Sequence, residues 1–242
     1  MTNYKRFQVF FRTSKTFGKY PIQEANSFIT YRSLLESFDA KEIAVIADHA
    51  SPEQQNYFME HTKCCYLTRR GNCGSFQLQI KLATERHPAE IYYFTEDDHL
   101  HLPQQKDYLE AGLEHFDFVS LYDHPDKYTL WEEQGLMRKI IATQAGHFAG
   151  SPSTVMTFAL KRETLMRCAD FFLNGPYTQA RLPFPRDHEM FTDLLSQGFS
   201  LGTCLSGRST HCERDGLSPY TDWIAYATAL QPQQAIYTSI AT

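Results

Sequence analysis

The chain has 242 residues, of which 42% are hydrophobic and 14% aromatic, enough to form the core of one large α/β domain. Its formal net charge of −5, without any block of basic residues, argues against a nucleic-acid-binding protein. No apolar stretch approaches the length of a membrane span, and the polar N-terminus lacks the apolar region of a signal peptide. We therefore expect a cytoplasmic protein, with peripheral contact to a membrane left open.

The first hundred residues alternate between short apolar runs and segments with helical spacing of apolar residues. This alternation is typical of a doubly wound, mostly parallel α/β sheet with helices on both faces. Ser51 and Pro52 mark one helix start, as N-cap and first helical residue. The predicted strands are 7–11, 43–47, 64–67 and 91–94, and the predicted helices lie within 21–38, at 51–61 and at 75–84.

The second half continues the α/β pattern, with one interruption. Residues 122–150 are polar, aromatic and poorly periodic, which predicts a long excursion outside the core. We find no internal repeat and no domain boundary, so we expect a single domain over residues 1–242. The predicted helices are 104–115, 161–173 and 187–197, and the predicted strands are 116–121, 155–160 and 201–205.

The six cysteines are scattered along the chain without a CxxC pair. A structural zinc site requires closely spaced ligand pairs, so this spacing argues against one. Reduced and mostly buried thiols are the expected state.

Three consecutive acids, Glu96, Asp97 and Asp98, follow the apolar strand at 91–94. The carboxyl ends of parallel strands meet at one edge of the sheet, where open α/β sheets bind their ligands. Crowded carboxylates repel one another unless a cation neutralises them, and Mg²⁺ or Mn²⁺ prefers oxygen ligands. The triplet therefore predicts a divalent metal site, and the alternative is an acidic loop that faces water.

Two earlier strand ends carry groups suited to a nucleoside. Asp48 can accept hydrogen bonds from a base or a ribose hydroxyl, and Asn72 lies between Gly71 and Gly74, where the backbone can approach a nucleotide closely. An ordinary acid at a strand end and an ordinary turn are equally open alternatives. The chain has neither a dinucleotide fingerprint nor a Walker A loop, which disfavours NAD and P-loop ATP chemistry.

Two later segments carry candidate catalytic or metal-binding groups. Asp187 and Glu189 stand at a predicted helix start, where Asp187 is a suitable N-cap and the helix dipole favours both acids. Alternatively, one of them is a general base that takes a proton from an acceptor hydroxyl. His211 follows the last predicted strand and could complete a metal site, or it could be an ordinary hydrogen-bonded histidine. The same alternatives apply to His99 and His101, which would share one face of a strand.

Taken in this order, the features over about residues 7–223 resemble the nucleotide-sugar glycosyltransferases of the GT-A fold. The resemblance implies a nucleotide-binding half at about 1–103 and an acceptor-binding and catalytic half at about 104–242. The triplet at 96–98 stands where that family has its DxD-type motif, with glutamate in the first place. By this resemblance the metal ligands are drawn from Glu96, Asp98 and His211, the base is Asp187 or Glu189, and the nucleotide contacts come from Arg12, Thr13, Asp48, Asn72, Gly74 and Asp97.

The activity implied by the resemblance is transfer of a sugar from a nucleotide-diphosphate sugar to a carbohydrate or other hydroxyl acceptor. Mn²⁺ or Mg²⁺ would stabilise the leaving diphosphate, and a carboxylate base near the acceptor would give inversion at the anomeric carbon. If neither carboxylate lies near the acceptor, a retaining route is the alternative. Tyr128, Trp131 and His147 would help to form the acceptor side.

Three other functions remain open on the sequence. Residues 12–18 are a weak version of the glycine-containing basic loop of sugar-phosphate nucleotidyltransferases. A non-catalytic module that binds nucleotides or carbohydrates could have the same fold. A metal hydrolase built on Asp97, His99 and His101 is the fourth reading.

Overall fold

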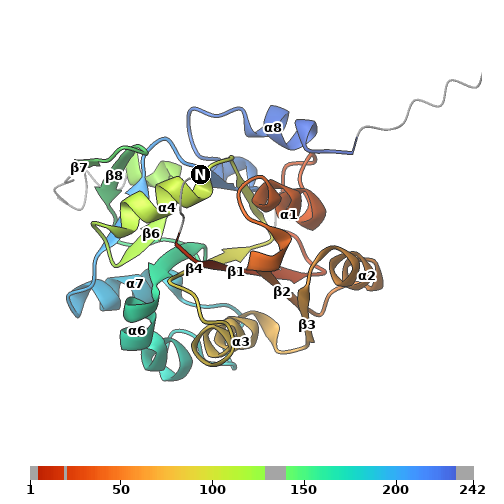
Figure 1. Ribbon diagram of the computed structural model, residues 1–242, viewed down its shortest axis with the longest axis horizontal. Coiled ribbons are helices and arrows are strands. Elements are labelled where there is room, and N and C mark those ends of the chain that lie inside the picture. The colour runs from red at the N-terminus through yellow and green to blue at the C-terminus, as the bar shows by residue number, and fades with distance from the viewer. Residues whose placement is uncertain (1–4, 19–20, 129–139, 233–242) are drawn as a thin grey trace, which may run out of the picture.

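The computed structural model describes residues 5–18, 21–128 and 140–232, so Trp131 lies outside the described part of the chain (Figure 1). Its main feature is a nine-stranded sheet with the strand order β3-β2-β1-β4-β9-β6-β10-β8-β7. Strands β8 and β9 run against the others, which confirms a mostly parallel sheet. The strands are β1 Phe7–Ser14, β2 Ile43–Asp48, β3 Cys64–Thr68, β4 Ile91–Glu96, β5 His99–His101, β6 Phe118–Ser120, β7 Ile140–Ala142, β8 His147–Gly150, β9 Phe158–Lys161, β10 Leu201–Cys204 and β11 Ser209–His211.

Helices cover both faces of the sheet, as the sequence pattern predicts (Figure 1). On one face α1, α2 and α4 pack over the strands, and on the other face α3, α6 and α7 do so. The α-helices are α1 Ser27–Leu35, α2 Pro52–His61, α3 Gly71–Glu85, α4 Gln105–Leu113, α6 Arg162–Asn174, α7 Asp187–Ser196 and α8 Trp223–Ala229, and the 3₁₀ turns are η1 Ala40–Glu42, η2 Pro125–Tyr128 and η3 Arg214–Gly216.

The apolar runs of the first half form the centre of the sheet because both of their faces are buried. In β4, Tyr92 and Phe94 join the core beneath α3 and α6, while Ile91 and Tyr93 join the core beneath α1 and α4. A strand that alternates between two cores needs an apolar residue at every position. Strands β2, β1 and β4 are parallel neighbours, so their carboxyl ends lie at one edge.

The start of α2 is confirmed, whereas α3 begins earlier than the sequence suggests. Ser51 Oγ accepts from the backbone N–H of Gln54 at 3.2 Å, and Gln54 Oε1 accepts from the Ser51 N–H at 2.9 Å. Helix α3 begins at Gly71 rather than at residue 75. The predicted loop at 71–74 is therefore the first turn of a helix.

Part of the predicted excursion at 122–150 belongs to the sheet. Strands β7 and β8 add two antiparallel strands at its edge, and Phe148 and Ala149 are buried there. These strands are short and contain polar and turn residues, so hydrophobic periodicity does not predict them from the sequence. The structure also adds a separate two-stranded sheet of β5 and β11, which the sequence pattern does not predict as a pair.

All six cysteines are free thiols, in agreement with the expectation from their spacing. Within residues 5–18, 21–128 and 140–232, no helix is both long and apolar enough to span a lipid bilayer.

Candidate functional site

A cleft of about 1080 Å³ opens at the carboxyl edge of β1, β2 and β4 and extends to the start of α7. Of the residues that the family resemblance assigns to the metal, the base and the nucleotide, all except Gly74 line this cleft. They are Arg12, Thr13, Asp48, Asn72, Glu96, Asp97, Asp98, Asp187, Glu189 and His211. Gly74 is buried in α3, where a Cβ would lie only 2.7 Å from Arg70 Cβ. Its lack of a side chain therefore makes room for Arg70.

The three acids of the triplet have three different environments. Arg12 Nη2 donates to Glu96 Oε1 at 2.6 Å, so Glu96 is paired with a guanidinium. Asp97 Oδ2 accepts from Thr13 Oγ1 at 2.6 Å and from the Ser14 N–H at 3.2 Å. Burial raises the pKa of Asp97 well above its ordinary value. Asp98 alone turns toward a histidine, so the triplet does not act as one carboxylate cluster.

Arg12 connects the ends of β1 and β4 with the first turn of α3. Its Nη1 donates to the carbonyl oxygen of Asn72 at 2.8 Å and to Asn72 Oδ1 at 2.7 Å. Arg12 itself is buried, whereas Asn72 is exposed in the cleft. Arg12 thus holds Asn72 and Glu96 in place, and Asn72 is the group that a ligand can reach.

Asp48 lines the cleft and holds the start of α3 through both carboxyl oxygens. Its Oδ1 accepts from the Arg70 N–H at 2.6 Å, and its Oδ2 accepts from the Gly71 N–H at 3.0 Å, so it caps the N-terminus of α3. Oδ2 also lies 2.8 Å from Nδ1 of His49, a half-exposed residue that lines the cleft. Sequence reasoning missed His49, although its place directly after a strand-end acid was a usable signal.

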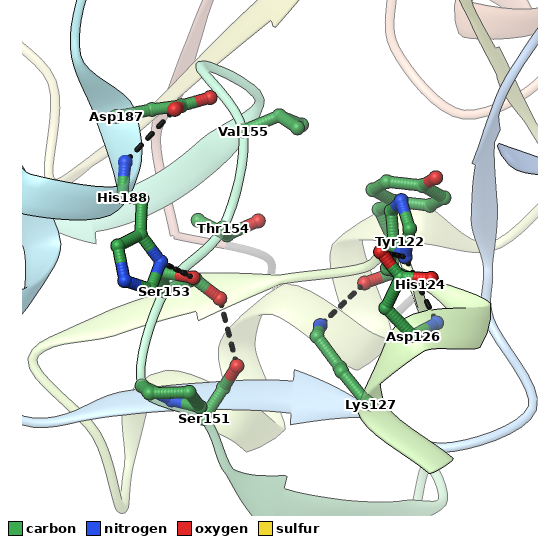
Figure 2. Close-up of a pocket in the computed structure, with 11 residues that line it drawn as sticks. Tyr122, His124, Asp126, Lys127, Ser151, Ser153, Thr154, Val155, Asp187 and His188 are labelled. Carbon is green, nitrogen blue, oxygen red and sulfur yellow. Dashed lines mark hydrogen bonds and ion pairs between the residues drawn. The ribbon is translucent and has the colours of Figure 1, made fainter. Parts of the chain in front are cut away.

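The N-terminus of α7 brings Asp187 and Glu189 to the cleft, but Asp187 is not the N-cap. The cap position is Arg186, which makes no side-chain capping bond, and Asp187 is the first helical residue. Asp187 Oδ1 accepts from the His188 N–H at 2.8 Å, a bond that keeps it in the first turn (Figure 2). Burial raises the pKa of Asp187, which makes it a stronger base than an ordinary aspartate.

A second pocket of about 320 Å³ adjoins the cleft (Figure 2). The two spaces share Val155 and Asp187 as lining residues. Lys127 Nζ donates to the Tyr122 carbonyl at 3.1 Å and to Thr203 Oγ1 at 2.8 Å, and burial lowers its pKa to about 8. The rest of the lining is mainly polar: His124, Asp126, Ser151, Pro152, Ser153, Thr154 and His188.

Two of the residues that the sequence suggests for the acceptor side, Tyr128 and His147, do not line this pocket. Tyr128 donates its hydroxyl to Asp123 Oδ2 at 2.5 Å, and His147 begins β8. Instead, Tyr122 from the same segment lines the pocket.

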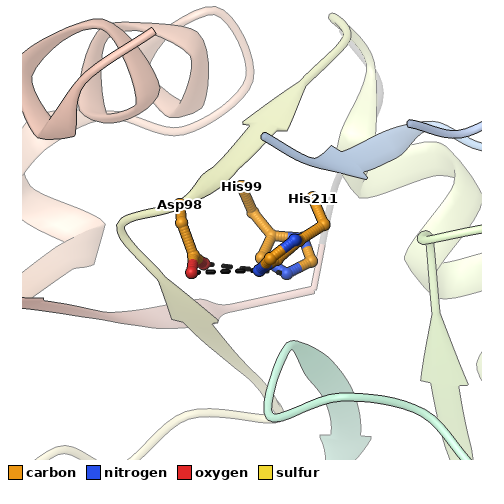
Figure 3. Close-up of side chains that lie close together, drawn as sticks. All are labelled: Asp98, His99 and His211. Atoms are coloured by element: carbon orange, nitrogen blue, oxygen red, sulfur yellow. Dashed lines mark hydrogen bonds and ion pairs between the residues drawn. The ribbon is translucent and has the colours of Figure 1, made fainter. Parts of the chain in front are cut away.

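Asp98, His99 and His211 form a cluster in which one candidate ligand atom from each residue lies within 4.8 Å of the others (Figure 3). The antiparallel pairing of β5 with β11 places His211 directly opposite His99. Asp98 Oδ2 lies 3.0 Å from His211 Nε2, and Asp98 Oδ1 lies 3.9 Å from His99 Nε2. Two strands and one turn therefore build the cluster.

The cluster passes a test of whether it could hold a cation. Within the described part of the chain, Asp98 Oδ1 and both ring nitrogens of His99 are buried without a hydrogen-bond partner. Buried polar atoms are normally satisfied, and unpaired ones at a site with carboxylate and imidazole ligands fit a bound metal ion. The predicted ligands Asp98 and His211 thus come together, His99 joins them, and Glu96 pairs with Arg12 instead.

Burial and charge set the protonation of the cluster. Burial opposes a charged imidazole at His211, but the hydrogen bond to Asp98 and its charge outweigh burial and raise the pKa of His211 to about 9. Burial also opposes ionisation of Asp98, yet the bond to His211 lowers the pKa of Asp98 overall. For His99, burial lowers the pKa well below the ordinary value and keeps the ring neutral, as a metal ligand must be.

Comparison with known proteins finds relatives only at the level of structure. No protein-family model and no curated protein matches the chain. A crystal structure of GalNAc-T7 with UDP, GalNAc and Mn²⁺ is 13% identical, with a TM-score of 0.57 over 89% of this chain and 45% of that chain. This chain thus spans less than half the length of that protein.

Two further solved structures are similar over most of both chains. A CMP:2-keto-3-deoxy-manno-octonic acid synthetase complexed with CTP is 12% identical, with a TM-score of 0.49 over 82% of this chain and 88% of that chain. A197 from STIV is 13% identical, with a TM-score of 0.47 over 88% and 90% of the two chains. The likeness to GalNAc-T7 confirms the predicted GT-A fold, and at this identity it establishes the fold alone.

Proposed function

We propose that the protein is a metal-dependent glycosyltransferase that moves a sugar from a nucleotide-diphosphate sugar to a hydroxyl acceptor. The observation that carries the proposal is the cluster of Asp98, His99 and His211 at the cleft that also contains Asp187. The fold shared with GalNAc-T7, whose crystal structure contains UDP, GalNAc and Mn²⁺, supports the same reading.

Asp98, His99 and His211 would hold the metal ion. A carboxylate with two imidazoles suits a transition-metal ion such as Mn²⁺ better than Mg²⁺, which prefers oxygen ligands alone. When bound, such an ion neutralises negative charge on the leaving diphosphate. Glu213 Oε2 lies 3.9 Å from His211 Nδ1 and would help to orient that ring from behind.

Asp187 is the residue that we propose as general base. It lies between the donor cleft and the second pocket, where a donor anomeric carbon and an acceptor hydroxyl could meet. Its carboxylate would take the proton of the acceptor hydroxyl as the hydroxyl oxygen bonds to the anomeric carbon. The hydroxyl oxygen would attack in line with the bond from that carbon to the diphosphate oxygen, which breaks and releases the nucleoside diphosphate, so the sugar would be transferred with inversion. Glu189 lines the donor cleft but not the second pocket, so it is the second candidate for the general base.

The second pocket would receive the acceptor. Its lining combines the hydroxyls of Ser151, Ser153 and Thr154 with two imidazoles, groups that both donate to and accept from a sugar hydroxyl. Its volume of about 320 Å³ is at the lower end of the range of small-ligand sites and would hold an acceptor of one or two rings.

The proposal is tested by thermal unfolding of the metal-free protein with Mn²⁺ and a panel of nucleotide sugars, together with release of the nucleoside diphosphate. We expect Mn²⁺ plus at least one nucleotide sugar to raise the melting temperature by several degrees, and Asp98→Asn to abolish that rise. Asp107→Asn is the matched control because Asp107 lies on α4, outside the cleft. No stabilisation with any nucleotide sugar would contradict the proposal.

Two alternative functions give different outcomes in the same preparation. Release of pyrophosphate from a nucleoside triphosphate and a sugar phosphate would indicate a nucleotidyltransferase. Binding of nucleotide sugars without turnover, unchanged in Asp187→Asn and Glu189→Gln, would indicate a non-catalytic module.

A further inference from the structure

His99 is the most deeply buried residue of the metal cluster. Its side chain is 0% exposed, against 19% for Asp98 and 21% for His211. Its Nε2 lies 3.9 Å from Asp98 Oδ1, so this nitrogen is within reach of a metal ion that both residues share (Figure 3). Among the described residues, neither Nε2 nor Nδ1 of His99 has a hydrogen-bond partner. The orientation of this ring therefore depends on packing.

This situation is unusual for a histidine that binds a metal. Such a histidine almost always donates its other ring N–H to a carboxylate, a backbone carbonyl or a water, and that contact fixes the direction of the ring. His211 has a carboxylate of this kind nearby, because its Nδ1 lies 3.9 Å from Glu213 Oε2. Within residues 5–18, 21–128 and 140–232, His99 has no equivalent. Another group must orient its ring.

Tyr122 packs edge-to-face against the imidazole of His99. The two ring centroids are 5.2 Å apart and the ring planes are at 86°. His211, itself a proposed ligand, is also 5.2 Å away, and His101 is 6.5 Å away. An edge-to-face contact is directional, because the positive edge of one ring meets the negative face of the other. The Tyr122 ring thus restrains the rotation of His99 as well as filling space beside it.

Tyr122 is itself held in place by several contacts. Its hydroxyl donates to the Gly216 carbonyl at 2.6 Å, and its N–H donates to Ser120 Oγ at 3.2 Å. Its backbone forms a bridge with Ser209, two residues before His211 on β11. The residue is 2% exposed. The Tyr122 ring is therefore fixed to the strand that carries His211.

Tyr122 also lines the second pocket, which His99 does not. There its ring meets the ring of His124, with centroids 5.3 Å apart and planes at 72° (Figure 2). Lys127 Nζ donates to the Tyr122 carbonyl at 3.1 Å, so two lining residues of this pocket contact Tyr122 directly. Tyr122 thus belongs both to the wall of the second pocket and to the surroundings of His99.

We propose that Tyr122 is the positioning residue for His99, and that its ring takes the place of the hydrogen bond that usually orients a metal-binding histidine. Without the ring, the imidazole of His99 could rotate, and its nitrogen would no longer be held at the metal position. The inference rests on the proposed function, because it requires that the cluster binds a metal. Since the same ring lines the second pocket, a ligand bound there would touch the group that orients a metal ligand.

The test compares Tyr122→Leu, which removes the ring, with Tyr122→Phe, which keeps the ring and loses only the hydroxyl. The measurements are titration of the metal-free proteins with Mn²⁺ and the visible absorption spectrum of the Co²⁺-loaded proteins, which reports the arrangement of the ligands. We expect Tyr122→Leu to bind Mn²⁺ about 10- to 100-fold more weakly and to have an altered Co²⁺ spectrum. Tyr122→Phe should keep the wild-type spectrum and an Mn²⁺ affinity within about threefold of wild type.

Tyr92→Leu is the matched control for the loss of a buried tyrosine. Tyr92 is 0% exposed, and its hydroxyl donates to the Ala83 carbonyl at 3.0 Å. Its ring stacks on Phe94 in the core beneath α3 and α6, away from the cluster. Both leucine variants should lower the melting temperature of the metal-free protein, whereas only Tyr122→Leu should weaken the binding of Mn²⁺.

The outcomes separate the two proposals. If the wild-type protein binds neither Mn²⁺ nor Co²⁺, the proposed function is wrong and this inference fails with it. If the wild type binds the metal and Tyr122→Leu keeps its affinity and spectrum, or if Tyr92→Leu loses affinity equally, the positioning role is wrong while the proposed function stands. Should Tyr122→Leu not fold, Tyr122→Phe decides: a retained Mn²⁺ affinity supports the role of the ring, and a loss of about tenfold or more overturns it.

Discussion

His211 Nε2 lies 3.0 Å from Asp98 Oδ2, although the two residues are 113 positions apart in the chain. The contact depends on the antiparallel pairing of β5 with β11, in which His211 stands opposite His99. It raises the pKa of the imidazole against the effect of burial and leaves Asp98 ionised. The imidazole of His211 therefore carries a proton that a metal ion would have to displace.

The first prediction concerns the pH dependence of metal affinity. His211 has a pKa raised to about 9, so in the metal-free protein it is protonated at neutral pH and must lose this proton to bind a metal. The affinity for Mn²⁺ should therefore rise with pH, by about tenfold per unit, up to pH 9, and level off above it. Titration of Mn²⁺ at several pH values measures this slope. His211→Asn should bind Mn²⁺ more weakly, and its affinity should no longer rise with pH in this way. A pH-independent affinity of the wild-type protein for Mn²⁺ would contradict the prediction.

The second prediction concerns the choice of metal. With two imidazoles among its ligands, the cluster should bind Mn²⁺ or Co²⁺ at least about tenfold more tightly than Mg²⁺. His99→Asp replaces one imidazole with a carboxylate and should reduce the ratio of Mn²⁺ or Co²⁺ affinity to Mg²⁺ affinity. His115→Asp is the control, since His115 is an exposed residue just beyond α4. Competition titrations measure the ratio, and a wild-type preference for Mg²⁺ would exclude His99 as a ligand.

The third prediction concerns the base. Asp187→Asn should lower the transfer rate by about 10²- to 10⁴-fold and change donor affinity little, because the amide cannot take a proton. Glu189→Gln is the matched comparison, since it removes a carboxylate from the same helical turn and should have a smaller effect. Equal losses of transfer rate in the two variants would contradict the assignment of Asp187 as the general base.

The pH profile of transfer offers a separate check on the base. Burial raises the pKa of Asp187, and only its ionised form can accept a proton. The rate should therefore fall on the acid side at a pH above the ordinary aspartate value of about 4. A rate that persists unchanged to about pH 4 at saturating metal would point to another base.

The fourth prediction concerns the Arg12–Glu96 pair, whose Nη2 and Oε1 atoms lie 2.6 Å apart. Arg12→Met leaves Glu96 without its partner and releases Asn72, and should lower the free energy of unfolding by about 3 kcal/mol. The double variant Arg12→Met/Glu96→Gln removes the stranded charge and should recover part of this loss. Urea unfolding measures both, and additive losses in the double variant would show that the pair is not coupled.

Much of the fold follows from local patterns. The unbroken apolar runs of β2 and β4 predict strands buried on both faces, and Ser51 with Pro52 predicts the start of α2. The position of the acids after these runs predicts the edge at which the cleft lies. Such signals are contained within a few residues, so they are readable without the fold. The short strands β7 and β8 carry too few alternating residues to be recognised in the same way.

The candidate site was predictable as a set of residues but not as a set of contacts. Asp98 and His211 were both expected near a metal and His99 was an open alternative, whereas the pairing of Glu96 with Arg12 was not expected. Glu96 ends β4, whereas Asp97 and Asp98 form the turn before β5, so the spacing of the triplet does not predict the direction of each carboxylate. The partner that each acid finds depends on neighbouring strands.

A mostly parallel sheet with acids at one edge is predictable from the sequence, because hydrophobic periodicity and strand ends are local properties of the chain. The role of each acid depends on its contacts in the folded protein. Asp48 caps α3 and holds His49, Asp97 binds Thr13, and Asp98 meets His211 across the β5–β11 pair. These assignments depend on strand register and helix position, which arise from packing between segments distant in the sequence.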